Sequence, residues 1–592
     1  MRSLFTKLLK NRVITGLALL FLVPAVVFGQ DEKTLAPVTR TYAITNVNII
    51  QAPGRKIDKG TVIVKNGLIT GAGKGLAIPP EAIVIKADSM YVYAGFIDGL
   101  SHTGITKPKE ETNRERAKDP GNPSPEKAGI NPQVDVRSLL NPEDKSVEEA
   151  RNLGFTTAQV VPYGNLLPGQ SAVILLGGKS ADEMVLANRT ALYSELTGAN
   201  GVYPSTIIGV MAKWRDLYKN AILSKSNEAL YASNRAGFER PSGDRILEAF
   251  YPVIDQKIPV LFKAEKILDI QRVYSLKADL GFPLVLAEVK EGWPMVNKIK
   301  ASGVKVFLSL DLPEEKKDEK KDDKKKDDKD NKDEKKDDKK EEKKEEKKET
   351  PAKPKTANDL EKEALEKRKA EAIANYVGQA STFQKAGIPF GFSAMSAKSK
   401  DIPANLRRMI TAGLSEDAAL AALTTTPAQL LGLSDRMGTI DNGKIANLVI
   451  SDKPYFNEKA KVRYVFVDGV MYEQEVKETP KKTEGAAKVA PGGTWSYSTE
   501  SPQGTTTGKL VIKDDSGTLS GTISNSMSNK DTELKSPSLD GSTLSFSFGF
   551  DAGGNQLTIE VSVAIEGDSF EGTMSVGTFG TFPIKGTRDP KK

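Results

Sequence analysis

The 592-residue sequence contains no cysteine and only one histidine, His102. The lack of cysteine excludes disulfides and thiolate metal ligands, so each folded domain must be stabilised by its packed core alone. Imidazole is the other common ligand of catalytic zinc, and a single histidine cannot supply the usual set. Composition therefore leaves almost none of the side chains that hold catalytic zinc.

Long apolar runs are also scarce, and the clearest one begins close to the amino terminus. Basic residues precede the apolar stretch 13–28, and the small residue Gly29 follows it. This stretch is shorter than the roughly 20 residues that a transmembrane helix needs. The pattern predicts a signal peptide over residues 1–29 and export to the periplasm or beyond the cell, with an uncleaved anchor as the alternative. No transmembrane segment is expected after cleavage.

Charge is nearly balanced, and it gives no reason to expect a nucleic-acid partner. The formal net charge of +7 is small for this length, and part of it lies in the predicted signal peptide. Residues 314–350 are almost wholly Lys, Asp and Glu, which predicts a disordered charged insertion. Residues 476–491 are rich in Lys, Thr, Ala and Pro and are predicted to form a linker.

The rest of the chain shows three different patterns. Segment 41–94 alternates β-branched runs with turn residues and contains an Asn66-Gly67 hairpin signal. Segment 95–435 alternates short apolar strands with helical stretches, which favours a parallel sheet with crossover helices and therefore an α/β fold. Segment 492–588 has short alternating strands separated by turns, which predicts a C-terminal all-β sandwich or barrel domain.

Four stretches of the sequence resemble motifs of the amidohydrolase superfamily, particularly of its imidazolonepropionase-like and dihydroorotase-like members. Ala94-Gly95-Phe96-Ile97-Asp98 is close to the Pro-Gly-Phe-Ile-Asp of the family, and Gly154-Phe155-Thr156-Thr157 to its Gly-Ile-Thr-Thr. Residues 405–433 resemble its final helices, and residues 437–450 together with 465–469 resemble its last strands. The similarity is strong at both ends of the region and weak in its middle.

This resemblance implies both a fold and a chemistry. The fold is a (β/α)8 TIM-like barrel over residues 95–435, with segments 41–94 and 436–475 joined in a small composite β-sandwich. The chemistry is hydrolysis of carbon–nitrogen bonds, with zinc or another divalent metal that activates water and polarises a carbonyl.

The metal ligands that the resemblance implies are largely missing. The His-x-His at the end of the first barrel strand falls on Leu100 and His102, and the later histidine positions fall on Lys263 and Glu288. The catalytic aspartate position falls on Met395. Leucine and methionine offer a hard divalent ion nothing useful, and an ammonium group has no lone pair. We therefore predict no metal ligands and no cofactor.

Three of these residues are the candidate catalytic groups: His102, Lys263 and Glu288. Lys263 would replace the metal charge by pairing with Glu288 or Glu265, or would act as a desolvated nucleophile or base. His102 would act as a general base or be a hydrogen-bonded core residue.

Two further residues follow the strand 158–161 and are candidates for substrate binding. Asn165 and Gln170 flank Pro168-Gly169, and their amides would reach a polar ligand at the barrel mouth. A simple Pro-Gly turn is the alternative.

The sequence leaves open whether this chain is an enzyme. We expect an exported, degenerate (metal-free) homologue with a binding or partner-supporting role, for a small-molecule or peptide ligand, in a homo-oligomer or with an active homologue. The alternative is an active hydrolase of non-peptide or dipeptide amide bonds with an atypical mononuclear or metal-free site. A third hypothesis assigns glycan or peptide binding to the C-terminal domain.

Overall fold

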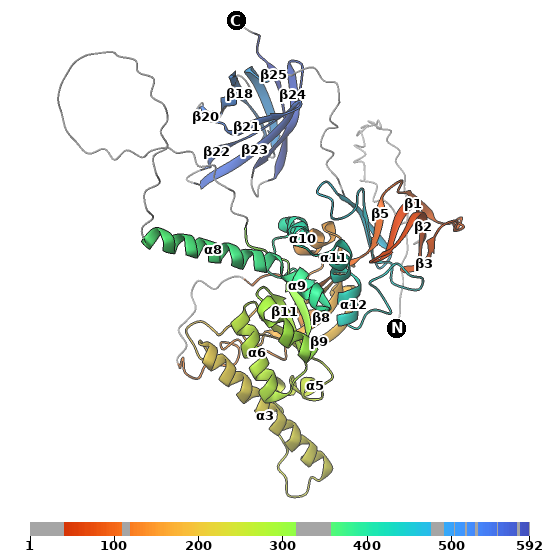
Figure 1. The fold of residues 1–592 in the computed structure, drawn as a ribbon, viewed down its shortest axis with the longest axis vertical. Coiled ribbons are helices and arrows are strands. Elements are labelled where there is room, and N and C mark those ends of the chain that lie inside the picture. The colour runs from red at the N-terminus through yellow and green to blue at the C-terminus, as the bar shows by residue number, and fades with distance from the viewer. Residues whose placement is uncertain are drawn as a thin grey trace, which may run out of the picture. The chain divides into compact units, whose positions relative to one another are not determined.

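The computed structural model describes residues 41–108, 119–314, 357–474 and 490–590, except for short gaps at 502–503, 516–517, 527–530, 553–554 and 577–579. The chain divides into two compact units between Glu475 and Val476 (Figure 1). The predicted signal peptide lies outside the described residues, as do the predicted charged insertion and linker apart from their end residues.

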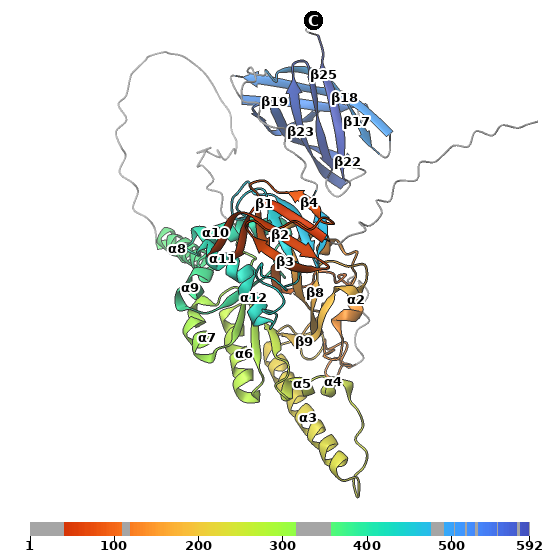
Figure 2. The ribbon, with the colours of Figure 1, turned by 90° about the vertical axis from the view of Figure 1, so that its right-hand side faces the viewer.

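An eight-stranded sheet that almost closes into a barrel forms the centre of the first unit (Figures 1 and 2). Each strand pairs with the next in chain order, and the pairing is parallel except around β8, which runs antiparallel to β7 and β9. The strands are β6 (Phe96–Ser101), β7 (Phe155–Val160), β8 (Gly169–Leu175), β9 (Val185–Glu195), β10 (Val260–Lys263), β11 (Leu284–Val289), β12 (Lys305–Ser309) and β13 (Phe390–Ser393).

The antiparallel strand β8 is a local departure from the predicted alternation of strands and helices. Only residues 161–168 connect β7 to β8, and a crossover to a parallel strand needs at least ten to twelve. The chain therefore returns as a hairpin, in which Gly164 within the connection and Gly169 at the start of β8 take φ values of 149° and 153°. The TIM-like barrel that the sequence predicts is otherwise present.

Helices connect the strands and cover the outside of the barrel (Figure 2). Their apolar sides pack against the strands: Trp214 of α3, for example, lies with its ring centroid 5.9 Å from that of Phe262 in β10. The elements are η1 (Val136–Leu139), α1 (Lys145–Asn152), α2 (Ala181–Met184), α3 (Ile207–Ser233), α4 (Arg245–Glu248), α5 (Tyr251–Ile254), α6 (Ile267–Leu280), η2 (Trp293–Met295), α7 (Val296–Ser302), α8 (Ala357–Val377), α9 (Gln379–Ala386), η3 (Ser399–Asp401), α10 (Ile402–Thr411), α11 (Glu416–Leu423) and α12 (Thr425–Leu430).

Side chains join the two ends of the barrel sheet, β6 and β13. Oδ1 of Asp98 accepts the backbone N–H groups of Leu100 at 3.1 Å and of Ala394 at 3.0 Å. The hydroxyl oxygen of Ser393 lies 3.0 Å from the carbonyl oxygen of Leu100. The carboxylate of Asp98 thus links β6 to the residue that follows β13 across the seam, where the two ends of the sheet meet.

A second eight-stranded sheet combines the segments on either side of the barrel. The segments meet where β5 pairs with β14, with Ala94 opposite Leu448. Asn66 and Gly67 have φ values of 51° and 81°, as the predicted hairpin turn between β2 and β3 requires. The strands are β1 (Thr41–Ala52), β2 (Arg55–Lys65), β3 (Leu68–Gly73), β4 (Ile83–Lys86), β5 (Tyr91–Ala94), β14 (Leu448–Ser451), β15 (Val462–Val467) and β16 (Val470–Glu473), and they share one apolar core.

The second unit is a nearly closed, nine-stranded antiparallel sheet around its own core. Trp495 is fully buried in that core, and its indole N–H donates to the carbonyl of Pro491 at 3.1 Å. The strands are β17 (Gly493–Ser501), β18 (Gly504–Asp515), β19 (Thr518–Asn525), β20 (Thr532–Glu533), β21 (Lys535–Asp540), β22 (Thr543–Ala552), β23 (Asn555–Glu566), β24 (Ser569–Val576) and β25 (Thr581–Arg588).

Within the described part of the chain, no helix combines the length and the apolar character needed to cross a lipid bilayer.

Candidate functional site

The candidate residues lie at the carboxyl ends of the barrel strands. Lys263 and Glu288 are at the ends of β10 and β11, and His102 follows β6 directly. Met395 lies two residues beyond β13. Because parallel strands end at the same edge of a sheet, the fold brings these separate segments to one end of the barrel.

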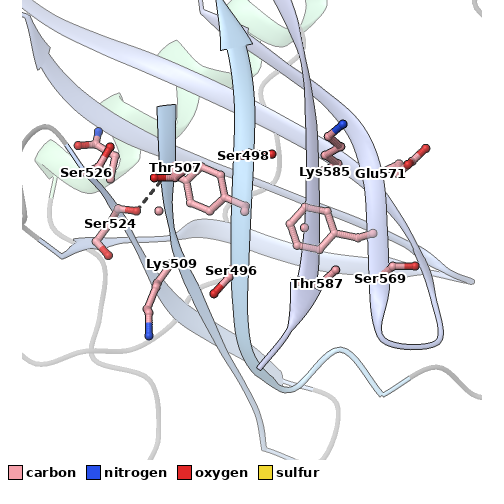
Figure 3. A pocket seen from close by; sticks show the side chains of 15 residues that line it. Ser496, Ser498, Thr507, Lys509, Ser524, Ser526, Ser569, Glu571, Lys585 and Thr587 are labelled. Carbon is pink, nitrogen blue, oxygen red and sulfur yellow. Dashed lines mark hydrogen bonds between the residues drawn. The ribbon is translucent and has the colours of Figure 1, made fainter. Parts of the chain in front are cut away.

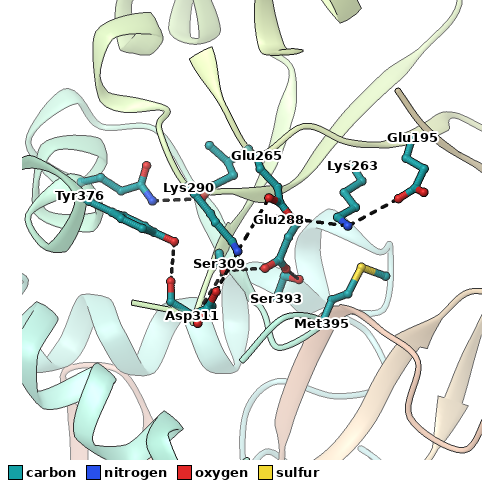
Figure 4. A network of polar contacts seen from close by, with 12 residues as sticks. Glu195, Lys263, Glu265, Glu288, Lys290, Ser309, Asp311, Tyr376, Ser393 and Met395 are labelled. Atoms are coloured by element: carbon teal, nitrogen blue, oxygen red, sulfur yellow. Dashed lines mark hydrogen bonds and ion pairs between the residues drawn. The ribbon is translucent and has the colours of Figure 1, made fainter. Parts of the chain in front are cut away.

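Lys263 forms ion pairs with two carboxylates (Figure 4). Its ammonium group lies 3.5 Å from Glu195 Oε2 and 3.4 Å from Glu265 Oε1. Lys263 and Glu195 are direct neighbours in the β9–β10 register, so the sheet itself places the pair on one face. The pairing with Glu265 agrees with the prediction, whereas Glu195 takes the place that sequence reasoning gave to Glu288.

The electrostatic environment keeps Lys263 charged. Burial alone would lower the pKa of Lys263, but the carboxylates of Glu195, Glu265 and Glu288 together raise it above its ordinary value. A nucleophilic lysine needs the opposite shift of its pKa. The surroundings therefore favour Lys263 as a fixed positive charge and not as a nucleophile.

Glu288 is fully buried and takes a left-handed backbone conformation with φ of 55°. This conformation falls at an irregularity in the β11–β12 ladder. Oε1 of Glu288 accepts the hydroxyl of Ser309 at 2.6 Å, and Oε2 accepts that of Ser393. Burial raises the pKa of Glu288, while the two serine hydroxyls oppose that rise. Both carboxylate oxygens thus have partners within the protein.

A second lysine extends the network away from Lys263 (Figure 4). Lys290 Nζ lies 2.8 Å from Asp311 Oδ2 and 3.8 Å from Glu265 Oε2. The hydroxyl of Tyr376, at the end of α8, donates to the backbone carbonyl of Asp311. Glu265 therefore bridges two lysines. We call Glu195, Lys263, Glu265, Lys290 and Asp311 the ion-pair network.

His102 is hydrogen-bonded and stacked outside the ion-pair network. Its Nδ1 lies 2.9 Å from the carbonyl oxygen of Val161, and its ring stacks on Tyr163 with centroids 3.8 Å apart. A carbonyl only accepts, so Nδ1 carries the proton and Nε2 presents a lone pair. Burial lowers the pKa of His102 to about 4, and the charge of Lys263 adds to that effect. The imidazole is therefore neutral at pH 7.

Apolar side chains occupy Leu100 and Met395, the two positions at which the family resemblance implies a histidine and an aspartate. Leu100 is fully buried in the apolar interior of the barrel with Tyr193 and Phe307. Met395 packs against this interior, and its sulfur lies 3.8 Å from the hydroxyl of Tyr193. His102 and Met395 both line a cavity of about 290 Å³, which Lys263 and Glu288 do not line.

These residues do not fit a divalent cation. Among the described residues, no group of three or more His, Asp or Glu side chains is arranged to hold a metal ion. The interior instead holds the Lys263 ammonium group, and the oxygens of Glu288 are used by serine hydroxyls. A metal would have to displace a positive charge that is already paired with carboxylates.

Asn165 and Gln170, the predicted substrate-binding residues, hold the backbone. The Asn165 amide donates to the carbonyl of Gly198 at 3.4 Å. Gln170 is buried and donates to the carbonyl of Pro132 at 3.1 Å. Neither side chain lines the cavity beside His102. Their substrate role remains a prediction, while their contacts explain the fold of the loops around the β7–β8 hairpin.

The second unit carries a separate, shallow hollow of about 710 Å³ on its sheet (Figure 3). Serine and threonine hydroxyls surround it, and Lys509, Lys585 and Glu571 are its charged groups. Tyr497 and Phe570 also line it but are buried, with exposed fractions of 5% and 1%. The hollow therefore has polar groups but no exposed aromatic platform for a sugar ring.

Comparison with known proteins finds a family match over part of the chain and a shared fold over most of it. The model of the Amidohydrolase family matches residues 360–472. The solved structure of an amidohydrolase from Thermotoga maritima MSB8 is 20% identical with a TM-score of 0.55, and the match covers 73% of this chain and all of that one. A match of this quality shows a shared fold.

Other solved structures match more weakly. A prolidase complexed with N-methylphosphonate-L-proline is 14% identical with a TM-score of 0.40, covering 74% of this chain and 100% of its own. An adenosine deaminase from Xanthomonas campestris with bound zinc is 12% identical with a TM-score of 0.32, covering 73% and 92%. A search of curated proteins returned no match to this sequence.

Proposed function

We propose that this chain, which belongs to the amidohydrolase superfamily, has replaced the divalent-metal centre of its relatives with the ion-pair network and serves in binding or in support of a partner. The observation that carries the proposal is the ammonium group of Lys263 between Glu195 and Glu265. It supplies a fixed positive charge where the family chemistry would need a metal-activated water.

The catalytic alternative is a metal-free hydrolase that uses His102 as its base. The lone pair on Nε2 of His102 is available for that role, but the lowered pKa of His102 makes it a weak proton acceptor. The partner of Nδ1 is the carbonyl of Val161 and not the carboxylate that orients the histidine of a catalytic triad. The contacts of His102 therefore favour binding over proton transfer.

Metal content and turnover test the proposal. The chain without residues 1–29, produced with added zinc and manganese, is expected to contain well under one metal ion per chain. It is also expected to leave dipeptides, lactams and hydantoins intact. A variant with Leu100→His and Lys263→His restores two imidazoles and serves as the control, because it should gain metal if the ligand loss is the cause.

Either of two results would contradict the proposal. The first is a tightly held, stoichiometric ion in the parent protein. The second is turnover that disappears in a folded His102→Ala variant. Export through residues 1–29 and assembly with an identical chain or an active homologue are parts of the same proposal, and cell fractionation with size-exclusion chromatography tests them.

A further inference from the structure

The carboxyl half of α3 extends beyond the helices that pack around the barrel. Figures 1 and 2 both show it continuing past α5 and α6. On one side this half is held by polar contacts, because Lys225 pairs with Asp255 and Glu228 accepts the hydroxyl of Tyr251 at 2.6 Å. Its other side faces solvent.

The solvent-facing side of α3 carries an apolar stripe. Its members recur at steps of three and four residues, so they lie on one side of the helix. Leu223, Leu230 and Ile222 are 66%, 55% and 39% exposed, although burial stabilises side chains of this kind by about 1.5–3 kcal/mol each. We call the following exposed residues the α3 stripe: Ile222, Leu223, Ser226, Ala229, Leu230 and Ser233.

The α3 stripe is complementary to a second copy of itself that runs in the opposite direction. When two copies meet with Ser226 at a twofold axis, residues at equal distances before and after Ser226 face each other. Leu223 then faces Ala229, a large side chain against a small one, and Ile222 faces Leu230. The small side chain of Ser226 lets the two helix axes approach to about 8 Å.

Charge favours the same alignment of the two helices. Lys219 is exposed, lies three residues before the stripe and faces Ser233 of the second copy. Ser233 is the last residue of α3, and the carbonyl end of a helix attracts a cation. Residues 230–233 are uncharged, so this last turn carries no cation of its own. Each copy therefore supplies the charge that the helix end of the other lacks.

We propose that α3 is the surface through which two copies of this chain form an antiparallel homodimer, with Ser226 at the twofold axis. The inference rests on the assembly with an identical chain that belongs to the proposed function, and it adds the surface and the register. A lipid surface suits the stripe less well, because a membrane-bound helix has a polar face rich in basic residues and a bulky apolar face. The α3 stripe is uncharged, and small residues interrupt it. The overlap spans about four helical turns, which predicts a dissociation constant in the micromolar range.

The lack of cysteine makes disulfide cross-linking a direct test of the register. A disulfide forms only where two Cα atoms come within about 7 Å of each other. Ser226→Cys, in the full chain without residues 1–29, is expected to give a covalent dimer under mild oxidation. Leu223→Cys mixed with Ala229→Cys should also cross-link. Each of these two variants alone should not, because its two cysteines lie about 9 Å apart along the helices. Ala232→Cys, exposed on α3 but outside the stripe, is the matched control and should stay monomeric on denaturing gels.

Sedimentation velocity of the same full chain measures the affinity. Leu223→Glu is expected to weaken dimerisation at least about tenfold, because it places a carboxylate in an apolar contact. Lys219→Gln should weaken it about threefold or more, because the helix ends lose their cations. Leu365→Glu is the matched control: Leu365 is a leucine of α8 that is 46% exposed, and this variant should dimerise like the parent.

Equal cross-linking by Ala232→Cys and Ser226→Cys would overturn the inference, as would a parent that stays monomeric across the micromolar range. A dimer that Leu223→Glu leaves intact would refute the α3 surface alone, since the assembly of the proposed function would then use another surface. Binding of a monomeric parent to phosphatidylglycerol vesicles, lost in Leu223→Glu, would assign the stripe to a membrane and refute the dimer. Metal content and turnover judge the rest of the proposed function separately.

Discussion

At the residue scale, Lys263 contributes a positive charge to the ion-pair network at the ends of the barrel strands. Its ammonium group faces Glu195 across the β9–β10 register and Glu265 two residues along its own chain. The exposed fractions of the Lys263 and Glu195 side chains are 26% and 12%, so this pair is only partly screened by water. Removing one partner of such a pair leaves an uncompensated charge.

Lys263→Met is therefore expected to lower the free energy of unfolding by about 1–3 kcal/mol, measured by urea denaturation at pH 7. Lys263→Met combined with Glu195→Gln should recover part of that loss, because the stranded carboxylate is removed. Lys369→Met is the control: Lys369 pairs with Glu366 on α8, both are 54% exposed, and the expected change is about 0–0.5 kcal/mol. Equal losses in both lysine variants would refute the role given to Lys263.

The titration of Asp98, at the seam between β6 and β13, makes the free energy of unfolding depend on pH. Burial raises the pKa of Asp98 to about 7, against the backbone N–H groups of Ala394 and Leu100, which lower it. The unfolded chain loses this proton near its ordinary pKa of 3.8, before the folded chain does. The free energy of unfolding therefore falls as the pH rises from about 4 to about 7, by up to about 4 kcal/mol from this group.

Asp98→Asn keeps an oxygen acceptor for both N–H groups and removes the titration. We expect the variant to be more stable than the parent at pH 8, with a smaller difference between them at pH 4.5, as measured by urea unfolding at both values. Comparing variant with parent cancels the other titrating groups. Asp119→Asn, at an exposed position, should reproduce the parent at both pH values. An unchanged pH dependence in Asp98→Asn would show that Asp98 is ionised throughout.

At the scale of the elements, the packing of β6 against the barrel interior requires a glycine at position 99. A Cβ atom added at Gly99 would lie 1.9 Å from Cδ1 of Phe307, whose ring fills the barrel interior. Gly391 of β13 faces the same ring, at 2.7 Å from its Cδ1. The two glycines thus let a large aromatic ring of β12 pack between the strands that meet at the seam.

Gly99→Ala is expected to destabilise the first unit by about 1–3 kcal/mol through overpacking, as measured by thermal or urea unfolding. Phe307→Leu introduced into Gly99→Ala should relieve part of the clash. Gly73→Ala in β3 is the control, because its added Cβ meets no atom within 4 Å. A loss of stability in Gly73→Ala equal to that in Gly99→Ala would show that the effect is one of backbone entropy and not of packing.

At the scale of the whole molecule, the chain contains two units with separate cores. Trp495 is fully buried in the second unit, and the other tryptophans, Trp214 and Trp293, belong to the first. Since the apolar residues of each unit pack among themselves, each unit has what it needs to fold alone.

Residues 490–592 produced alone are therefore expected to unfold in one cooperative transition, with Trp495 fluorescence as the probe. The midpoint should match the one reported by Trp495 in a full chain that carries Trp214→Phe and Trp293→Phe. A non-cooperative transition of the fragment, or a midpoint far below that of the full chain, would show that the second unit depends on the first.

Periodicity and composition determined a large part of this protein. The Asn66-Gly67 turn, most barrel strands and the strands of the second unit follow from residues close together in the sequence. The prediction that metal ligands are missing rests on the single histidine and on Leu100 and Met395 at positions where the family resemblance implies metal-site residues. Such features are local, so the sequence can be interpreted without knowing which segments meet.

The tertiary structure decided which distant residues form ion pairs and hydrogen bonds with one another. Glu195 pairs with Lys263 because the register of two strands places them side by side, although more than sixty residues of chain separate them. Ser309 and Ser393 reach Glu288 for the same reason. The hairpin at β8 and the stacking of His102 on Tyr163 likewise depend on how the chain returns to the barrel. Pairing between distant segments is set by the closing of the sheet, which local sequence patterns do not encode.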